Sequence, residues 1–324
     1  MAYKQIVYQR AKAELESRKK RAESENDARR LKAISLCPEI ARIEGEIASY
    51  GLDAVKALGM GADAESFIRN LSVKSLAAQE RKKELLKAAG LPEDYLDIKY
   101  TCPLCKDTGS HDGYFCDCQK QEVINQAKAL LGENTPVRKC TFEKFSLDFY
   151  PDVVDPVLGV SQREHMASIY NFCKDYANHF TKKAQGLIMY GGTGLGKTHL
   201  SLAIANVVIE RGYDVYYGSI QSIMEKLERE HFGRRSTDES EKDAITGADL
   251  LIIDDLGVEF TTQFTTAALH DILNTRTLKG LPTIISTNLE MDEIYEKYTQ
   301  RIASRLFGSS FPLAFCGRDI RQIK

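Results

Sequence analysis

The chain has 324 residues, a formal net charge of −2 at pH 7 and eight cysteines. This length suits two domains, or one domain with an extension, and the near-zero charge excludes whole-protein attraction for nucleic acid, so any DNA contact needs a local basic patch. No run approaches the roughly 20 apolar residues of a membrane span, and residues 1–5 lack the apolar core of a signal peptide, so we expect a cytoplasmic protein without a membrane partner.

Residues 1–100 predict a helical N-terminal region. Residues 3–34 are charged and poor in large apolar side chains, which indicates a long exposed helix. Ile40, Ile43 and Ile47 recur at helical spacing, and residues 76–86 predict another helix that ends near Gly90. These segments predict a small helical bundle or hairpin, in which we interpret the isoleucines as internal packing rather than a docking face.

Four of the cysteines are clustered in residues 101–120, namely Cys102, Cys105, Cys116 and Cys118. Two close pairs joined by a polar, glycine-bearing turn predict a structural zinc site, in which four thiolates fill every position of a tetrahedron. The Cys-x-Cys pair is tighter than the common Cys-x-x-Cys, and His111 in the turn is an alternative ligand. Free thiols and a redox disulfide are the other interpretations.

Residues 121–140 are interpreted as a linker that closes at the glycine- and proline-bearing stretch 132–136. From residue 141 to 324, apolar strands alternate with helices, which predicts an α/β domain with a mostly parallel sheet. The expected strands are residues 187–190, 215–217, 250–253, 283–286 and 313–315. The polar residues 234–243 predict a mobile loop.

A phosphate-binding loop follows the first of these strands and precedes a predicted helix at residues 200–205. It fits G-x-x-x-x-G-K-[ST] at every fixed position and consists of Gly191, Gly192, Thr193, Gly194, Leu195, Gly196, Lys197 and Thr198. The glycines let backbone N–H groups face a phosphate at the helix N-terminus. Lys197 is expected to reach the β- and γ-phosphates of ATP, and Thr198 to hold Mg²⁺. A glycine-rich surface turn is the alternative, which the strand-loop-helix order disfavours.

Polar side chains follow directly after two of the later predicted strands. Asp254 and Asp255 follow the apolar strand 250–253, a placement in which the first orients Mg²⁺ and the second polarises the attacking water. Asn288 follows the next strand and suits positioning of that same water. A simple acidic turn at the strand end is the alternative for the two carboxylates.

The order of these motifs resembles the AAA+ ATPases. Residues 251–257, 281–288 and 301–306 are similar to the DnaC/DnaI-type replicative helicase loaders and the related IstB transposition ATPases, over roughly residues 141–324. The resemblance implies a parallel five-stranded sheet, self-association through the AAA+ domain, Arg305 as an arginine finger on the next subunit's ATP, and Arg321 as a nucleotide sensor. A guanidinium suits both tasks, although Arg301 and Arg305 also fit an exposed helical face. Asp255 stands where many AAA+ proteins have Glu, so we expect slow hydrolysis.

Loaders of this family carry an extra helix, along single-stranded DNA, between the second strand and the acidic strand. The candidate DNA-binding residues in that interval are Lys226, Arg229, Phe232, Arg234 and Arg235. Acidic neighbours at positions 225, 228 and 230 leave a plain solvated face as the alternative.

The resemblance implies an ATP-controlled loader that delivers the hexameric replicative helicase onto single-stranded DNA, with the N-terminal region gripping the helicase. The alternatives are an IstB-like transposition helper that binds duplex DNA and a transposase, and a zinc-dependent interaction adaptor with a vestigial ATPase. The cysteine cluster and the long N-terminal extension favour the loader, and the intact catalytic residues disfavour the adaptor.

Overall fold

The computed structural model describes residues 5–57, 64–132, 137–154, 156, 159–233 and 240–322. Internal contacts divide the chain into two compact units, of which one is residues 10–122 and the other is residues 123–324 together with Met1–Gln9. Most of the predicted helical region and the whole cysteine module therefore lie in the same unit, residues 10–122. In the described part of the chain no helix combines the length and apolar character needed to cross a bilayer.

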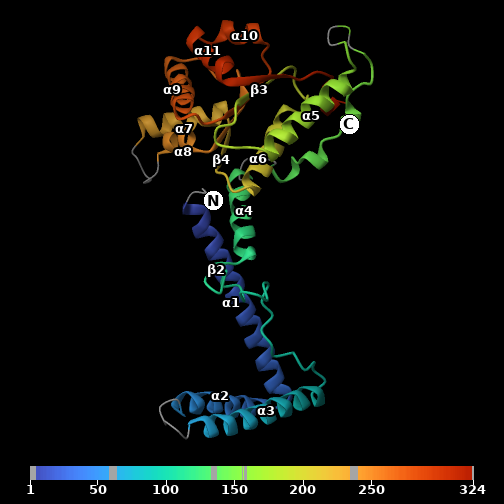
Figure 1. Ribbon diagram of the computed structural model, residues 1–324, viewed down its shortest axis with the longest axis vertical. Helices are drawn as coiled ribbons and strands as arrows, with labels where there is room; N and C mark the ends of the chain where they lie inside the picture. Colours follow the sequence, from blue (N-terminus) through green and yellow to red (C-terminus); the bar gives the residue numbers. More distant parts are fainter. Residues whose placement is uncertain are drawn as a thin grey trace. The chain divides into compact units, whose positions relative to one another are not determined.

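Helices dominate the unit of residues 10–122. Its elements include most of α1 (Gln5–Leu36) and all of α2 (Glu39–Ala57) and α3 (Ala64–Ala88), so the long first helix is confirmed. Helices α2 and α3 pack side by side as a hairpin (Figure 1). Ile40 and Ile43 are buried against α1 and α3, with Ile47 partly buried beside them. The predicted internal packing of these isoleucines is therefore confirmed.

Helix α3 begins twelve residues before its predicted start at residue 76. Its first half lacks a continuous buried stripe, because Phe67 and Val73 are exposed and serines interrupt the apolar positions. The short strands β1 (Ser110–His111) and β2 (Tyr114–Phe115) then form an antiparallel hairpin. Helix α4 (Asp117–Gly132) follows, so most of the predicted linker is helical. Val123 and Ala127 give this helix a buried stripe that composition alone did not reveal.

The other unit contains a parallel five-stranded sheet in the order β4-β5-β6-β3-β7. The strands are β3 (Gly186–Tyr190), β4 (Val215–Ser219), β5 (Leu250–Leu256), β6 (Thr283–Thr287) and β7 (Ser310–Ala314). The helices are α5 (Gln162–Asn178), α6 (Lys197–Glu210), α7 (Ile220–Phe232), α8 (Glu241–Gly247), α9 (Gln263–Lys279), α10 (Met291–Lys297) and α11 (Gln300–Ser309). The predicted α/β class and parallel five-stranded sheet are confirmed.

Alternation along the strands builds a core on each face of the sheet. Leu187 and Met189 of β3 belong to the cluster that includes α5 and α6, whereas Ile188 between them belongs to the cluster that includes α7, α9 and α11. Successive side chains of a strand point to opposite faces, and helices cover both faces (Figure 1). The inner strands β5, β6 and β3 are therefore buried on both sides, as is typical of parallel sheets, whereas the edge strands β4 and β7 are partly exposed.

Two details differ from the predicted elements. Strand β7 lies at 310–314 rather than 313–315, because this edge strand contains the exposed Phe311 and a proline and so lacks the continuous apolar run of the inner strands. The last three residues of the predicted mobile loop, 241–243, are in α8. Residues 234–239 of that loop, including the candidate DNA-binding residues Arg234 and Arg235, lie outside the described residues.

Candidate functional site

The phosphate-binding loop joins the end of β3 to the start of α6, with Lys197 as the first helical residue. Gly194 has φ +71°, and a Cβ there would lie 1.7 Å from Asp319 Oδ1. Gly196 has φ +88°, and a Cβ there would lie 2.7 Å from the Phe145 ring. Only glycine combines a left-handed backbone with such close neighbours. The loop glycines thus allow other segments to pack directly against the loop.

Lys197 is the buried cation of this loop, with 5% of its surface exposed. Its Nζ donates to the carbonyl oxygens of Gly191 at 2.7 Å and Gly192 at 2.6 Å, and to Asn288 Oδ1 at 2.8 Å. Burial lowers the pKa of Lys197, and the nearby carboxylates of Asp255 and Asp254 partly oppose this shift. The structure therefore brings the lysine of the loop and the asparagine after β6 into direct contact.

Asp254, at the C-terminal part of β5, is 4% exposed and accepts hydrogen bonds from three hydroxyl groups. Thr198 Oγ1 and Ser286 Oγ donate to Oδ1, the first at 3.1 Å, and the Tyr217 hydroxyl donates to Oδ2 at 2.6 Å. A threonine hydroxyl beside a carboxylate supplies the hard oxygen ligands that Mg²⁺ prefers. Thr198 and Asp254 therefore fit the predicted magnesium site.

The pairing of β5 with β6 is irregular between Ile253 and Leu256. Asp255 lies in this irregular stretch and has a φ of +54°. Its backbone N–H donates to Ser286 Oγ at 3.0 Å, which holds this conformation. Burial raises the pKa of the Asp255 carboxyl, as does the charge of Asp254, while Lys197 and Arg321 act in the opposite direction. A carboxylate with a raised pKa is a better proton acceptor near neutral pH.

A cavity of about 640 Å³ is lined by most of the residues predicted to bind or hydrolyse ATP. Residues 193–199 form one wall, and Asp255, Asn288 and Arg321 also line it. The Ile320 N–H donates to the Gly194 carbonyl at 3.1 Å, which fixes the C-terminal segment against the loop. Arg321 is mostly exposed, and its Nε donates to Asp319 Oδ1 at 3.1 Å. The predicted sensor is thus at the cavity mouth.

Arg305 is not among the residues that line this cavity. It is on α11, and its Nε is the buried side-chain nitrogen that has no hydrogen-bond partner in the described part of the chain. Arg301, one turn earlier, is exposed.

Several side chains of the site were not predicted from the sequence. Tyr217 and Ser286 hold Asp254, and the opposite wall of the cavity comes from residues just before and after the predicted domain start at 141. These wall residues are Lys139, Cys140, Lys144, Phe145, Ser146 and Phe149. Phe145 stacks on Tyr150 and Tyr170 with centroid distances of 5.9 and 5.7 Å. Residues 139–150 include four aromatic side chains, but nothing in the sequence places them against the loop.

The candidate DNA-binding residues on α7 lie in different environments. Lys226 Nζ pairs with Glu241 Oε1 at 3.0 Å and donates to the Tyr216 hydroxyl at 3.2 Å. Arg229 is exposed and lies 3.9 Å from Glu225 Oε2. Phe232 is 76% exposed, with its ring 5.8 Å from that of Phe264. An exposed aromatic ring suits base stacking, whereas Lys226 already has an acidic partner.

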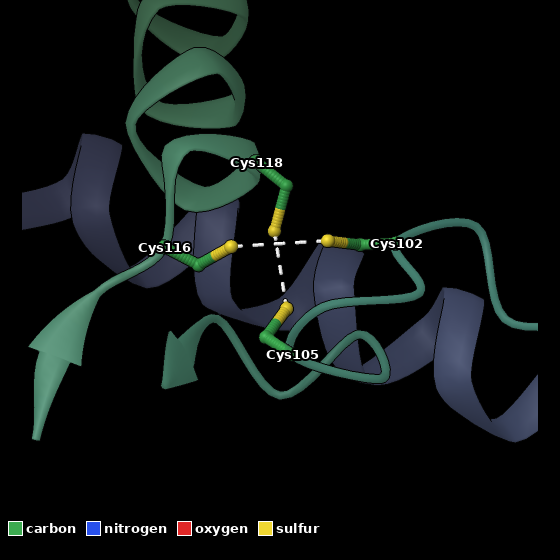
Figure 2. Close-up of side chains that lie close together, drawn as sticks. All are labelled: Cys102, Cys105, Cys116 and Cys118. Carbon is green, nitrogen blue, oxygen red and sulfur yellow. Dashed lines mark hydrogen bonds between the residues drawn. The ribbon is translucent and has the colours of Figure 1, made fainter. Parts of the chain in front are cut away.

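The four clustered cysteines converge, with all their Sγ atoms within 4.8 Å of one another. Figure 2 shows Cys102 and Cys105 approaching from one loop, and Cys116 and Cys118 from the start of α4. The cross pairs Cys102–Cys116 and Cys105–Cys118 are separated by 3.8 and 3.3 Å. Four thiols in this arrangement fit a tetrahedral zinc ion.

The loops that carry these cysteines are held by backbone hydrogen bonds. Buried Asp107 accepts from the N–H groups of Thr101 at 2.8 Å and Cys102 at 2.9 Å, and the Cys116 N–H donates to the Gly109 carbonyl. His111, the alternative ligand, pairs instead with Asp112 at 3.0 Å and is not in the four-sulfur group. The geometry therefore favours four cysteine ligands.

The comparison with known proteins supports a nucleotide-binding role for the larger unit. Residues 173–304 match the family of IstB-like ATP binding proteins. The replicative helicase loader DnaC of Escherichia coli (strain K12) is 27% identical over 143 residues, which are 44% of this chain and 58% of that relative. DnaC of Buchnera aphidicola subsp. Acyrthosiphon pisum (strain APS) is 26% identical over 185 residues, which are 56% of this chain and 70% of that relative.

Two solved structures also match part of this chain. The crystal structure of the DnaC helicase loader has a TM-score of 0.47 and 17% identity, and covers 56% of this chain and 98% of that one. The crystal structure of DnaI has a TM-score of 0.45 and 21% identity, and covers 56% and 95%. The chain spans 58% of the length of the Escherichia coli relative. The family match and the curated relatives confirm that the ATPase region of this chain resembles the DnaC-type replicative helicase loaders.

Proposed function

We propose that this chain is an ATP-dependent loader that places the hexameric replicative helicase on single-stranded DNA when replication begins. The observation that carries the proposal is the convergence of Lys197, Asp255, Asn288 and Arg321 on one cavity, in a domain that resembles DnaC-type loaders. The same convergence argues against a vestigial ATPase. The transposition helper is not favoured, because the curated relatives cited above are named helicase loaders.

The ATPase step follows from the positions of these side chains. Thr198 and Asp254 would hold Mg²⁺, which neutralises phosphate charge when bound. Lys197 would move from the loop carbonyls to the β- and γ-phosphates, while Asn288 orients a water. Asp255 accepts a proton as this water attacks the γ-phosphorus, and the bond to the β-phosphate oxygen breaks to release ADP. The short Asp255 side chain supports slow hydrolysis in an isolated subunit.

Two further parts complete the proposed loader. The unit of residues 10–122, with its zinc-holding cysteines, would grip the helicase, and Arg229 and Phe232 of α7 would contact single-stranded DNA. Arg234 and Arg235 belong to the same proposed contact. Lys226 contributes only if it leaves Glu241, since its ammonium is already paired.

A capture experiment with the replicative helicase of the same organism tests the proposed function. Immobilised full-length chain is incubated with the helicase in the presence of ATP, ADP or a non-hydrolysable ATP analogue. We expect retention of the helicase in at least one nucleotide state, and release in another. The absence of helicase binding in every state, together with tight binding to duplex DNA, would support the transposition helper instead.

Arg305→Ala should lower ATP hydrolysis by about 10³-fold, because an arginine finger acts mainly in the transition state. Nucleotide affinity should stay within about threefold of wild type, since Arg305 does not line its own cavity. Arg301→Ala on the same helix is the matched control, and thermal unfolding of both variants checks the fold. Phosphate release and fluorescent-nucleotide titration supply the two readouts.

Mixing two inactive variants tests whether Arg305 acts between subunits. Lys197→Ala chains retain Arg305, and Arg305→Ala chains retain the phosphate-binding loop. A mixture should regain part of the ATPase activity, because a Lys197→Ala subunit can supply Arg305 to the intact loop of its neighbour. A mixture as inactive as its components would contradict the assignment of Arg305 as a finger acting in trans.

A further inference from the structure

Tyr217 is one of two side chains, not predicted from the sequence, that donate hydrogen bonds to Asp254, the carboxylate of the predicted magnesium site. It is on β4, and its hydroxyl donates to Asp254 Oδ2 at 2.6 Å. This length is typical of a hydrogen bond between a hydroxyl and an ionised carboxylate.

The two oxygen atoms of Asp254 have different donors. Oδ1 accepts from Thr198 and Ser286, whereas Tyr217 is the donor recorded at Oδ2 within the described residues. The carboxylate is nearly inaccessible to water, so an oxygen that lost its donor would be left without a partner or would turn toward another one. Tyr217 therefore fixes which oxygen faces Thr198.

The Tyr217 ring is itself held in place by packing. It contacts the cluster of Val137, Cys140 and Leu202, which lies beside the cavity wall. Asn206 Nδ2 donates to the carbonyl oxygens of Val137 at 2.9 Å and Cys140 at 2.8 Å, so this cluster is tied to α6. A hydroxyl on a ring supported in this way has little freedom, which is what accurate placement of a metal ligand requires.

We propose that Tyr217 is a positioning residue for magnesium: its hydroxyl aligns the Asp254 carboxylate so that Mg²⁺ strengthens nucleotide binding. This inference rests on the proposed ATP function. It assigns to Tyr217 the dependence of nucleotide binding on Mg²⁺. Tyr217 is not among the residues that line the cavity, and its hydroxyl is engaged by Asp254. Its loss is therefore expected to affect the metal-dependent part of binding and to leave the metal-independent part unchanged.

The adjacent tyrosine provides a matched control. Tyr216 is on the same strand, but its side chain points to the other face, where its hydroxyl donates to Glu241. Tyr216→Phe and Tyr217→Phe each remove one phenolic oxygen and keep the ring. Of the two changes, Tyr217→Phe alone removes a donor to Asp254.

The experiment measures the affinity of full-length protein for a fluorescent ATP analogue, in EDTA and in excess Mg²⁺. The ratio of the two dissociation constants gives the strengthening by Mg²⁺. In Tyr217→Phe we expect this ratio to fall about tenfold, the equivalent of roughly 1.4 kcal/mol, which is close to the lower end of the range for a hydrogen bond to a charged group. Affinity in EDTA should stay within about twofold of wild type, and Tyr216→Phe should behave as wild type in both conditions.

Direct titration of Mn²⁺ into the nucleotide complex, followed by electron paramagnetic resonance, should show the same weakening in Tyr217→Phe. An unchanged or larger Mg²⁺ ratio in this variant would overturn the inference and leave the ATP function intact. Parallel weakening in EDTA and in Mg²⁺, with a lower unfolding temperature, would also overturn it, because that pattern indicates a structural role. A wild-type chain that binds no nucleotide would overturn both the inference and the proposed function.

Discussion

Lys197→Ala is expected to abolish ATP hydrolysis, with turnover at least about 100-fold below wild type. The ammonium group is buried beside the cavity, within hydrogen-bond distance of Asn288 and of two loop carbonyls. No other cation lies in the phosphate loop, so alanine leaves the charge that develops on the phosphates without a partner there. Phosphate release at saturating ATP measures the loss.

The fold should survive this substitution. Burial lowers the pKa of Lys197, which means that the site destabilises the charged form relative to water. The thermal unfolding midpoint should remain within a few degrees of wild type, because the apolar core on each face of the sheet does not include Lys197. Lys242→Ala is a suitable control, because Lys242 pairs with Asp271 on α9 and does not line the cavity.

The same variant separates a nucleotide switch from a passive adaptor. If ATP controls the grip on helicase or DNA, Lys197→Ala should also lose helicase delivery, measured as unwinding of a forked DNA by added helicase. A variant that hydrolyses no ATP but still delivers helicase at the wild-type rate would show that the phosphate-binding loop does not control loading.

The central part of the fold could be predicted from the sequence because its signals are local. Residues 250–253 of β5 are a continuous apolar run followed directly by two carboxylates, and the phosphate-binding loop has fixed spacing. Parallel strands place their carboxyl ends at one edge of the sheet. The sequence therefore predicts that Asp254, Asp255 and Asn288 lie together at this edge.

The parts of the site that the sequence does not predict depend on contacts between residues far apart in the chain. Tyr217 is one of several tyrosines on partly buried strands, and only the pairing of β4 with β5 brings its hydroxyl to Asp254. The wall at 139–149 lines the cavity because Phe145 packs against Gly196, a contact that no sequence spacing encodes. Glycine and proline in residues 132–136 predict a linker, whereas the helix formers before them form α4.

Removal of zinc is expected to unfold the cysteine module, since a structural zinc site contributes on the order of 10 kcal/mol of binding energy to the folded state. The short strands β1 and β2 are exposed and pair over only two residues each, so they supply little apolar burial of their own. Lys106 and Asp107 have φ values of +52° and +56° in the turn after Cys105. Four sulfur atoms bound to one ion would offset the cost of this turn.

Cys105→Ser is the sharpest test, because Cys105 is buried and its Sγ lies 3.3 Å from that of Cys118. Purified wild-type chain should contain one zinc per chain by elemental analysis, and the variant should lose it. Amide hydrogen exchange over residues 101–120 should then rise to unfolded rates.

Cys37→Ser is the control for Cys105→Ser, since Cys37 is a partly buried thiol of the same unit outside the cluster. It should retain zinc and keep residues 101–120 protected. The helical hairpin of α2 and α3 should stay protected in both variants, because Ile40, Ile43 and Leu86 give it a core of its own. Less than about half an equivalent of zinc in wild-type protein, with exchange unchanged by chelation, would mean that hydrogen bonds such as those to Asp107 hold the module without a metal.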